Sequence, residues 1–423
     1  MTDVDLWNEQ FRADPYPAYA RLREETPVYR AAGGMGFDLW LITRQDAARA
    51  ALTDPRLASH PRHAPQRLRD MGIFTAEAGP AGVNMLSADA PDHTRLRRLV
   101  SKAFTRRRIE ALRPRVQEIT DALADAMTHR NQQEDGAEVD LIAALAFPLP
   151  ITVICELLGV PVADRDDFQA WSRAMIEIPL ADDKLALRGQ AQQSLHRYLD
   201  DLVTRKRSEI DRGTGADDQP DLVSALVVAA DERDQLTDPE LLGMIMLLLI
   251  AGHETTVNLI GNGMLALLRH PDQMKLLRAQ PELLPSAVEE LLRYDGPVER
   301  STMRFATEDV EIGGVRIPAG SVVSVVLAAA DRDPAHAPGA DQLDITRADH
   351  GHLAFGHGIH YCLGAPLARL EGEVAIGTLL RRFPDLALAC RPEELCWRGG
   401  PGVNLLNIIR GLEALPLRLG PAV

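Results

Sequence analysis

Cys362 stands at the end of a glycine-rich segment, Phe355 to Gly364, and directly before residues typical of a helix. Glycines such as Gly356 and Gly364 let the backbone approach a flat group closely. At the start of a helix, the helix dipole and the free N–H groups stabilise a thiolate and lower the pKa of the cysteine. The thiolate is the form of cysteine that binds metal ions. The sequence therefore predicts a metal-binding thiolate at Cys362.

A polar block, Ala251-Gly252-His253-Glu254-Thr255-Thr256, interrupts a stretch that is otherwise apolar. A carboxylate is costly to bury without a partner, so Glu254 is not expected to be an ordinary core residue. Glycine and hydroxyl groups inside a helix favour a local distortion that leaves room for a ligand and for water. A polar stripe that reaches solvent is the alternative. The block alone does not decide between the two.

Two further pairs have helical spacing. Glu290 and Arg293 are three residues apart, and His93 and Arg97 are four apart, so each pair shares one face of a helix. Taken alone, the first pair indicates a solvated salt bridge and the second an exposed, arginine-rich helix.

The residues Phe355, Gly358, His360, Cys362 and Gly364 match the pattern Phe-x-x-Gly-x-His-x-Cys-x-Gly. In this the chain resembles the cytochrome P450 family, and the resemblance extends over nearly the whole chain. It implies that Cys362 is the axial iron ligand of haem b (iron protoporphyrin IX) and that Phe355, Gly356 and Gly364 contact the haem. Thiolate ligation pushes electron density toward the iron and favours O–O cleavage.

Two alternatives remain for this segment. One is an inert buried cysteine. The other is a zinc site assembled from the histidines and the cysteine of this region, namely His350, His352, His357, His360 and Cys362. Structural zinc sites normally use four ligands in characteristic spacings, and a match over ten residues argues against both alternatives.

The resemblance also implies roles for the other groups. Ala251 would lie against the haem, Thr255 would donate a hydrogen bond to oxygen at the iron, and Glu254 would help to relay protons from water. Glu290 and Arg293 would form a buried pair, joined by Arg347, that braces the cysteine loop. These three are expected to be structural residues.

Haem carries two propionates, which cationic and hydrogen-bonding side chains hold. The resemblance assigns this task to His93, Arg97, Arg304 and His360. Arg300 competes with Arg304 because it lies one helical turn, or two strand pairs, away. The match of Arg304-Phe305-Ala306 to the family pattern favours Arg304.

The activity implied is that of a monooxygenase, which inserts one oxygen atom from O2 into a hydrophobic small molecule by hydroxylation or epoxidation. Residues 148–161 and 251–262 look most like actinobacterial enzymes that act on macrolides and other polyketides in antibiotic biosynthesis. Residues 397–407 form a longer segment than is usual, at a hairpin that enters the substrate pocket in relatives. Two rival functions are a peroxide-driven hydroxylase or decarboxylase of fatty acids and a haem protein that only binds.

Electrons are expected to come indirectly from NAD(P)H, through a ferredoxin reductase and a ferredoxin. An acidic ferredoxin would be attracted to a basic cluster on this otherwise acidic chain. An ordinary solvated surface is the alternative for this cluster. Its members are Arg95, Arg97, Arg98, Lys102, Arg106, Arg107 and Arg108.

Composition limits the remaining possibilities. The 423 residues carry a formal net charge of −15, which argues against nucleic-acid binding. The longest strongly apolar run, Leu241 to Ile250, is too short for a bilayer span, and no leader is seen at Met1. The four cysteines are scattered, as expected for reduced thiols. We therefore expect a cytoplasmic monomer without a membrane anchor.

The elements that must position these residues are mainly helical, with a smaller β region, and a single domain over 1–423 is expected. The clearest helix begins at Thr237 with a capping-box spacing and ends at His270. Others are expected from His93 to about Thr105 and from Arg106 or Arg107 toward His129. A hairpin over 310–317, a strand over 322–327, a lid loop over 59–92 and an exposed loop over 211–221 complete the prediction.

Overall fold

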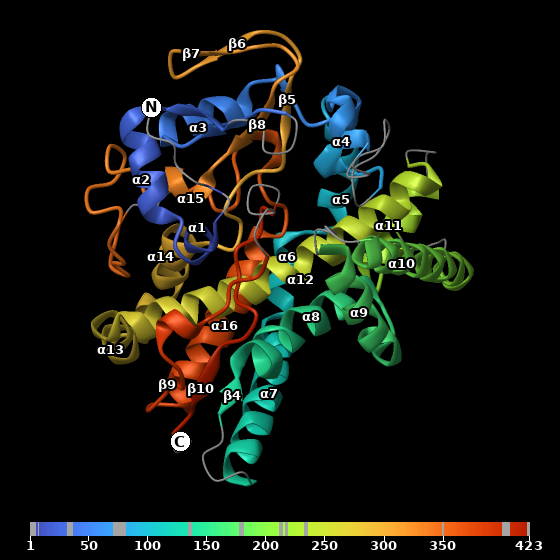
Figure 1. The fold of residues 1–423 in the computed structure, drawn as a ribbon. Helices are drawn as coiled ribbons and strands as arrows, with labels where there is room; N and C mark the ends of the chain where they lie inside the picture. The colour runs from blue at the N-terminus through green and yellow to red at the C-terminus, as the bar shows by residue number, and fades with distance from the viewer. Residues whose placement is uncertain are drawn as a thin grey trace.

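The computed structural model shows a mainly helical protein with small β-sheets, as the sequence predicts (Figure 1). It describes residues 6, 8–31, 37–70, 82–133, 138–176, 182–210, 215, 219–231, 236–348, 351–399 and 407–420. The helices are α1 (Glu9–Ala13), α2 (Tyr16–Glu25), α3 (Gln45–Thr53), α4 (Gln66–Asp70), α5 (Asp92–Ala103), α6 (Arg106–Ala111), α7 (Arg113–Gln133), α8 (Pro148–Leu158), α9 (Arg165–Ile176), α10 (Asp182–Glu209), α11 (Leu222–Asp231), α12 (Asp238–Arg269), α13 (Pro271–Ala279), α14 (Leu284–Asp295), α15 (Leu327–Ala330) and α16 (Ala365–Arg382).

The strands are short and form three separate groups. They are β1 (Val28–Ala31), β2 (Leu39–Ile42), β3 (Leu57–Ala58), β4 (Val139–Asp140), β5 (Arg304–Ala306), β6 (Val310–Ile312), β7 (Val315–Ile317), β8 (Val322–Val325), β9 (Ala387–Leu388) and β10 (Pro416–Arg418). The sheets have the orders β1-β2-β8-β5-β3, β4-β10-β9 and β6-β7, and β2 pairs with β8 in parallel. Figure 1 shows the five-stranded sheet and the β6–β7 hairpin at one end of the molecule.

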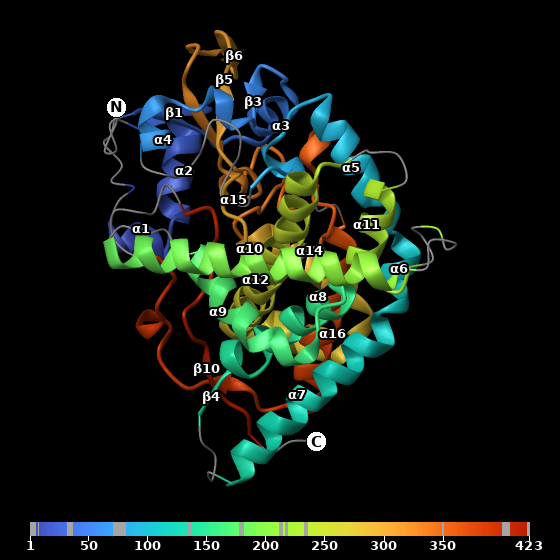
Figure 2. The same cartoon turned by 90° about the vertical axis from the view of Figure 1, so that its right-hand side faces the viewer.

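Helix α12 is the central element, and its 32 residues span roughly 48 Å at 1.5 Å per residue. Its N-terminus has the predicted capping box, in which Thr237 and Glu240 satisfy each other's backbone N–H groups. The helix packs on α8, α14 and α16, and α10 lies across it (Figure 2). Its length and composition would suit a membrane span, but 78% of its most apolar window is buried inside the protein, which is typical of a core helix.

The predicted distortion of α12 is not found. The α-helical assignment continues through residues 251–256, and the Thr255 hydroxyl donates to the Ala251 carbonyl at 3.0 Å. A π-helical turn occurs instead at Ile142–Ala146, before α8. Gly252 allows close packing here, because a Cβ at that position would lie 2.9 Å from the Ile154 side chain of α8.

Side chains on the two faces of the five-stranded sheet belong to two apolar clusters. Tyr29 and Val322 contribute to one cluster, and their chain neighbours Val28 and Val323 contribute to the other. This alternation follows from the period of two residues along a strand. The sheet is therefore covered on both faces, while the long helices share a third and larger cluster.

Most predicted boundaries are close to those observed, with two exceptions. The helix expected from Arg106 or Arg107 to His129 is broken at Leu112 into α6 and α7, because Pro114 has no N–H to continue the ladder. The strand expected over 322–327 ends at Val325, and Leu327 begins α15. The predicted hairpin turns at Gly313 and Gly314, which both have positive φ.

Two expected loops are described only in part. The range 59–92 contains α4 and short 3₁₀ turns at Pro61–His63 and Met85–Ser87, so it is less irregular than predicted, and residues 71–81 lie outside the described residues. The range 211–221 does connect two helices, but Asp221 at its end is buried and bonded to Lys206 and Ser224. Residues 211–214 and 216–218 lie outside the described residues.

Candidate functional site

The cysteine loop is held by its own backbone. The Cys362 N–H donates to the Phe355 carbonyl at 2.9 Å and closes the loop three residues before α16 begins. Gly358 has φ of +72°, and a Cβ there would lie 3.0 Å from the Leu52 carbonyl oxygen, so this position requires glycine. The loop thus places the cysteine at a helix N-terminus, as predicted.

The Cys362 thiol is accessible but surrounded by protein. Its side chain is exposed, yet burial raises the pKa of the thiol, and the N–H groups of Gly364 and Ala365 and the charges of Arg97 and Arg369 oppose that rise. The residue is thus open to solvent while its thiol is closely surrounded by protein atoms. The opposing groups all favour the thiolate, which is the form that iron binds.

A cluster of positive and potentially positive groups lies near the cysteine. The rings of His93 and His360 are 4.4 Å apart, and Arg304 and Arg97 act on both histidines electrostatically. Burial, with these charges, lowers the pKa of His93 and lowers the pKa of His360 to about 3. The structure therefore brings together all four residues predicted to bind the propionates.

This cluster has too few anions. Both ring nitrogens of His93 and the Nε of Arg304 are buried. None of these three atoms has a hydrogen-bond partner among the described residues. Asp89 is the carboxylate that acts on His93 and Arg304, and it already accepts from the N–H groups of Ser59 and His60 at 2.7 and 3.0 Å. Further carboxylates would accept from Arg304 and from the His93 nitrogen that carries the proton, so the site fits a haem with two propionates.

Arg300 lies elsewhere. It is fully buried and donates to the Tyr19 hydroxyl at 3.3 Å and to the Asn407 carbonyl at 2.5 Å. Of Arg300 and Arg304, it is Arg304 on β5 that acts electrostatically on His93 and His360. The structure therefore supports the choice of Arg304 over Arg300.

The polar block of α12 is divided between two faces of the helix. Ala251 is exposed and Thr255 is partly exposed, one turn apart, on a helix that is buried on most of its surface. Glu254 is buried and forms an ion pair with Arg398, and its backbone carbonyl accepts from Asn258 at 2.9 Å. Successive residues are about 100° apart around a helix, so the acid and the alcohol point in different directions.

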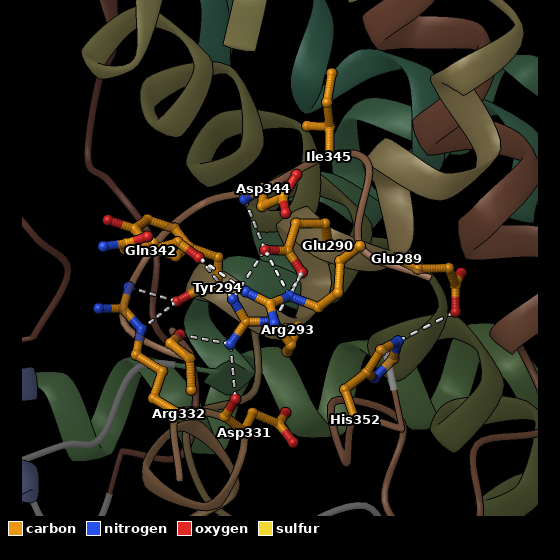
Figure 3. Close-up of polar contacts among 12 residues, drawn as sticks. Glu289, Glu290, Arg293, Tyr294, Asp331, Arg332, Gln342, Asp344, Ile345 and His352 are labelled. Carbon is orange, nitrogen blue, oxygen red and sulfur yellow. Dashed lines mark hydrogen bonds and ion pairs between the residues drawn. The ribbon is translucent and has the colours of Figure 1, made fainter. Parts of the chain in front are cut away.

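The predicted brace is assembled around Glu290 of α14 (Figure 3). Its carboxylate accepts from Arg293 at 2.7 and 2.9 Å and from Arg347 at 3.2 Å, and the Glu290 and Arg293 side chains are almost completely buried. Arg293 also donates to the carbonyl groups of Asp331 and Ala340, at 2.8 and 2.7 Å. Each buried charge therefore has partners, as a stable buried pair requires.

Two residues that the sequence analysis did not identify extend this brace to the cysteine loop. The Asp331 carboxylate accepts from the N–H of Leu353 at 2.6 Å, and burial raises the pKa of Asp331 to about 7. Glu289 bonds His352 at 3.1 Å and Arg369 of α16 at 2.6 Å, and the hydrogen bonds from Arg369 and His352 lower its pKa to about 2 against the effect of burial. Neither Asp331 nor Glu289 lies in a periodic sequence pattern that would have identified it.

Glu371 of α16 was also missed. It is fully buried beside the Thr256 hydroxyl, and burial raises its pKa to about 8. Neither of its carboxylate oxygens has a hydrogen-bond partner within the described part of the chain. The sequence signal that could have identified Glu371 is its position as a single acid on the apolar face of the helix that follows Cys362.

The zinc alternative loses support from the geometry. Among the residues that the structure describes, no three or more His, Cys, Asp or Glu side chains are gathered as ligands. His352 is bonded to Glu289, and His360 lies beside His93 and Ser59. His350 lies outside the described residues.

Known proteins share this organisation. A family model described as Cytochrome P450 matches residues 15–387. The vitamin D(3) 25-hydroxylase of Pseudonocardia autotrophica is 50% identical over 419 residues, covering 99% of this chain and 96% of that protein. The 6-deoxyerythronolide B hydroxylase of Saccharopolyspora erythraea is 45% identical over 430 residues, covering 99% and 100%. The tirandamycin C-bound P450 monooxygenase TamI has a TM-score of 0.85 at 44% identity, covering 98% of this chain and 99% of that one.

Proposed function

Because this chain belongs to the cytochrome P450 family and is a haem-dependent monooxygenase, we propose that it hydroxylates or epoxidises a macrolide or another polyketide product. The observation that carries the haem assignment is the exposed Cys362 beside His93, Arg97, Arg304 and His360, where buried nitrogens of His93 and Arg304 have no hydrogen-bond partner among the described residues. Haem bound there through the Cys362 sulfur would supply the redox centre that activates O2. Phe355, Gly356, Gly364 and Ala251 would contact its ring.

Two residues of α12 are proposed to handle protons. One oxygen atom enters the substrate and the other leaves as water, so protons must reach the site in a controlled way. The Thr255 hydroxyl lies on the partly exposed face, where it could exchange its bond to the Ala251 carbonyl for one to a bound reactant. Glu254, on the other face, would pass protons inward from water.

The substrate class is supported by the relatives. One acts on 6-deoxyerythronolide B, and another was solved with tirandamycin C. The vitamin D(3) 25-hydroxylase is 50% identical to this chain, against 45% for the 6-deoxyerythronolide B hydroxylase, so a secosteroid is the competing substrate. Residues 400–406, in the segment that appeared long in the sequence, lie outside the described residues and give no information on the pocket.

The electron supply is proposed to be NAD(P)H, a ferredoxin reductase and a ferredoxin, in the cytoplasm. Arg98, Arg106 and Arg107 are exposed and would attract an acidic ferredoxin. Arg95 and Arg108 contribute less, since they bond Glu240 and the Gln219 carbonyl. Association with a ferredoxin should therefore weaken steeply as salt is raised, and a salt-independent affinity would contradict this docking surface.

Substrate-induced difference spectroscopy tests the proposal directly. The holoenzyme is titrated with macrolactones, secosteroids and long-chain fatty acids, and products are then sought under ¹⁸O2 with NADPH, reductase and ferredoxin. We expect a spin-state shift and a singly ¹⁸O-labelled product with a macrolactone. Turnover of fatty acids with peroxide alone would favour the peroxide-driven rival, and no shift with any compound would favour a protein that only binds haem.

The role of Thr255 is tested by Thr255→Ala, with Thr255→Ser as the matched control that keeps the hydroxyl. With the hydroxyl removed, we expect NADPH oxidation to continue while product per NADPH falls on the order of tenfold, since one positioned hydrogen bond is lost. Thr255→Ser should retain most of the coupling. Equal coupling in all three proteins would contradict the assignment.

A further inference from the structure

The acid of α12 has a specific partner on a distant part of the chain. Only 6% of the Glu254 side chain and 22% of the Arg398 side chain are exposed, and Oε1 of Glu254 contacts Nη1 of Arg398. A carboxylate buried this deeply is costly without a cation. His253 is the other titratable group that acts with Glu254 and Arg398, and burial lowers its pKa, so it is neutral near pH 7. Arg398 therefore supplies the positive charge.

Arg398 is fixed from its other side by the C-terminal segment. Its backbone N–H donates to the Gly411 carbonyl at 2.8 Å, and its Nε donates to the Leu412 carbonyl at 3.0 Å. Trp397 and Leu412 form an antiparallel bridge beside it. An arginine held at both its backbone and its guanidinium loses little further freedom when it binds a carboxylate, unlike an exposed arginine on a flexible stem.

The C-terminal segment in turn rests directly on α12. A Cβ at Gly411 would lie 1.9 Å from the side-chain oxygen of Asn258, so the backbone there touches the helix. Asn262 donates to the Arg410 carbonyl at 3.0 Å. Glu254, Asn258 and Asn262 follow at intervals of four residues, so one face of α12 contacts this segment. The position of the acid is thus set by the C-terminal segment.

We propose that Arg398 is a positioning residue that keeps the Glu254 side chain directed away from Thr255, and so controls when this acid can deliver a proton. The inference rests on the proposed function of Glu254. While the guanidinium is paired, it holds the carboxylate against the C-terminal segment. Without the guanidinium, the carboxylate has lost this fixed partner and can rotate. Glu254 could then deliver protons without first leaving Arg398.

The test uses the holoenzyme without substrate, so it does not depend on knowing the substrate. NADPH oxidation and peroxide release are measured with reductase and ferredoxin in Arg398→Gln, Glu254→Gln and the double variant. We expect Arg398→Gln to raise peroxide release on the order of tenfold, the effect of one lost charged hydrogen bond. The double variant should behave like Glu254→Gln, because a glutamine cannot donate the proton.

A second measurement reports on the ion pair without activity. Urea unfolding is measured for the wild type and these three variants. Arg398→Gln should show a lower midpoint than the double variant, because the single change leaves a buried carboxylate unpaired. Arg398→Lys should restore part of both properties. Arg391→Gln is the matched control, since Arg391 pairs with Glu394 on the surface near the same end of the chain.

Different results would overturn different claims. Peroxide release in Arg398→Gln at the wild-type level, or a rise that persists fully in the double variant, would refute the positioning role of Arg398. Wild-type behaviour of Glu254→Gln would remove the proton-relay role from the proposed function. Absence of any oxygenated product from the wild type with the whole substrate panel would count against the proposed function and leave the Arg398 measurement valid.

Discussion

At the scale of single residues, the basic cluster near Cys362 contains buried polar atoms that have no hydrogen-bond partner among the described residues. Arg304 is buried on β5, and burial lowers its pKa, with Asp89 as the carboxylate that opposes this. His93 is buried with both nitrogens unpartnered among the described residues. Buried polar atoms without partners destabilise a folded chain, so these residues lower the stability of the protein in the absence of a bound anion. This cost couples haem binding to the stability of the protein.

Arg304→Gln should therefore act in opposite directions on the two forms of the protein. Haem transfer to an acceptor apoprotein should be faster on the order of tenfold, because a charged hydrogen bond to a propionate is lost. The haem-free chain should unfold at the same or a higher urea concentration, because an uncompensated buried charge is gone. Arg316→Gln on the exposed hairpin is the control. Slower haem loss, or marked destabilisation of the haem-free chain, would contradict this account.

Glu371 predicts a pH effect on stability. Burial raises its pKa from 4.5 to about 8 in the folded protein. Folding therefore favours the protonated form, and this contribution is complete below pH 4.5 and is lost as the pH rises through about 8. Glu371→Gln, which cannot ionise, should unfold near the wild-type urea concentration at pH 5 and at a higher one at pH 8.5.

The size of that difference should be on the order of a few kcal/mol, since one pKa unit corresponds to about 1.4 kcal/mol. Glu393→Gln, at an exposed position, serves as the control and should show no such dependence. A gap between Glu371→Gln and wild type that does not change between pH 5 and pH 8.5 would mean that Glu371 is not protonated in the fold.

At the scale of elements, α12 positions other segments through places where backbone lies directly on it. At Gly243, a Cβ would lie 2.1 Å from the backbone oxygen of Val83, and the Met85 N–H points at the Met244 sulfur at 3.2 Å. The segment that leads into α5 is thus pinned to the central helix. Because α5 carries His93, the position of the proposed haem-binding cluster depends on this contact.

Gly243→Ala should force residues 83–85 away from α12, because neither backbone can yield easily. We expect a loss of about 1–3 kcal/mol in the free energy of unfolding, the range for overpacking, together with weaker substrate-induced spectral shifts. Gly189→Ala on α10 is the matched control: nothing lies within 4 Å of its Cβ, so better helix propensity should stabilise it slightly. Equal stability of the two variants would argue against the contact.

At the scale of the whole molecule, the buried network around Glu290 joins parts of the chain that are far apart. It links α14 to residues 331–347 and, through Asp331 and Leu353, to the cysteine loop. Glu289 makes a parallel link from α14 to α16 and His352. The site at Cys362 is therefore supported by charges that do not touch it.

Glu290→Gln should leave Arg293 and Arg347 without their carboxylate and cost about 3–5 kcal/mol in the free energy of unfolding. Arg293→Lys should also destabilise, since lysine cannot replace the forked donors that reach three carbonyl groups. Urea unfolding and retained haem per chain are the measurements. Full haem retention with unchanged unfolding in Glu290→Gln would show that the brace is dispensable.

Chemistry that depends on neighbouring residues was determined by the sequence alone. The cysteine loop, the capping box of α12 and the helical pairs His93–Arg97 and Glu290–Arg293 depend on spacing along one segment, where geometry follows directly from residue type. The mainly helical class and the family follow from the same local patterns. The α6–α7 break could also have been anticipated from Pro114, since proline acts locally.

Only the tertiary structure decided which distant residues meet. It selected Arg304 over Arg300, paired Glu254 with Arg398, and buried Glu371 and Asp331. Sequence separation carries no information about such pairs, because long-range packing determines which polar group loses water and which charge replaces it. Cys362 was therefore identifiable from its own neighbours, whereas Arg398, the partner of Glu254, became visible only once the chain was folded.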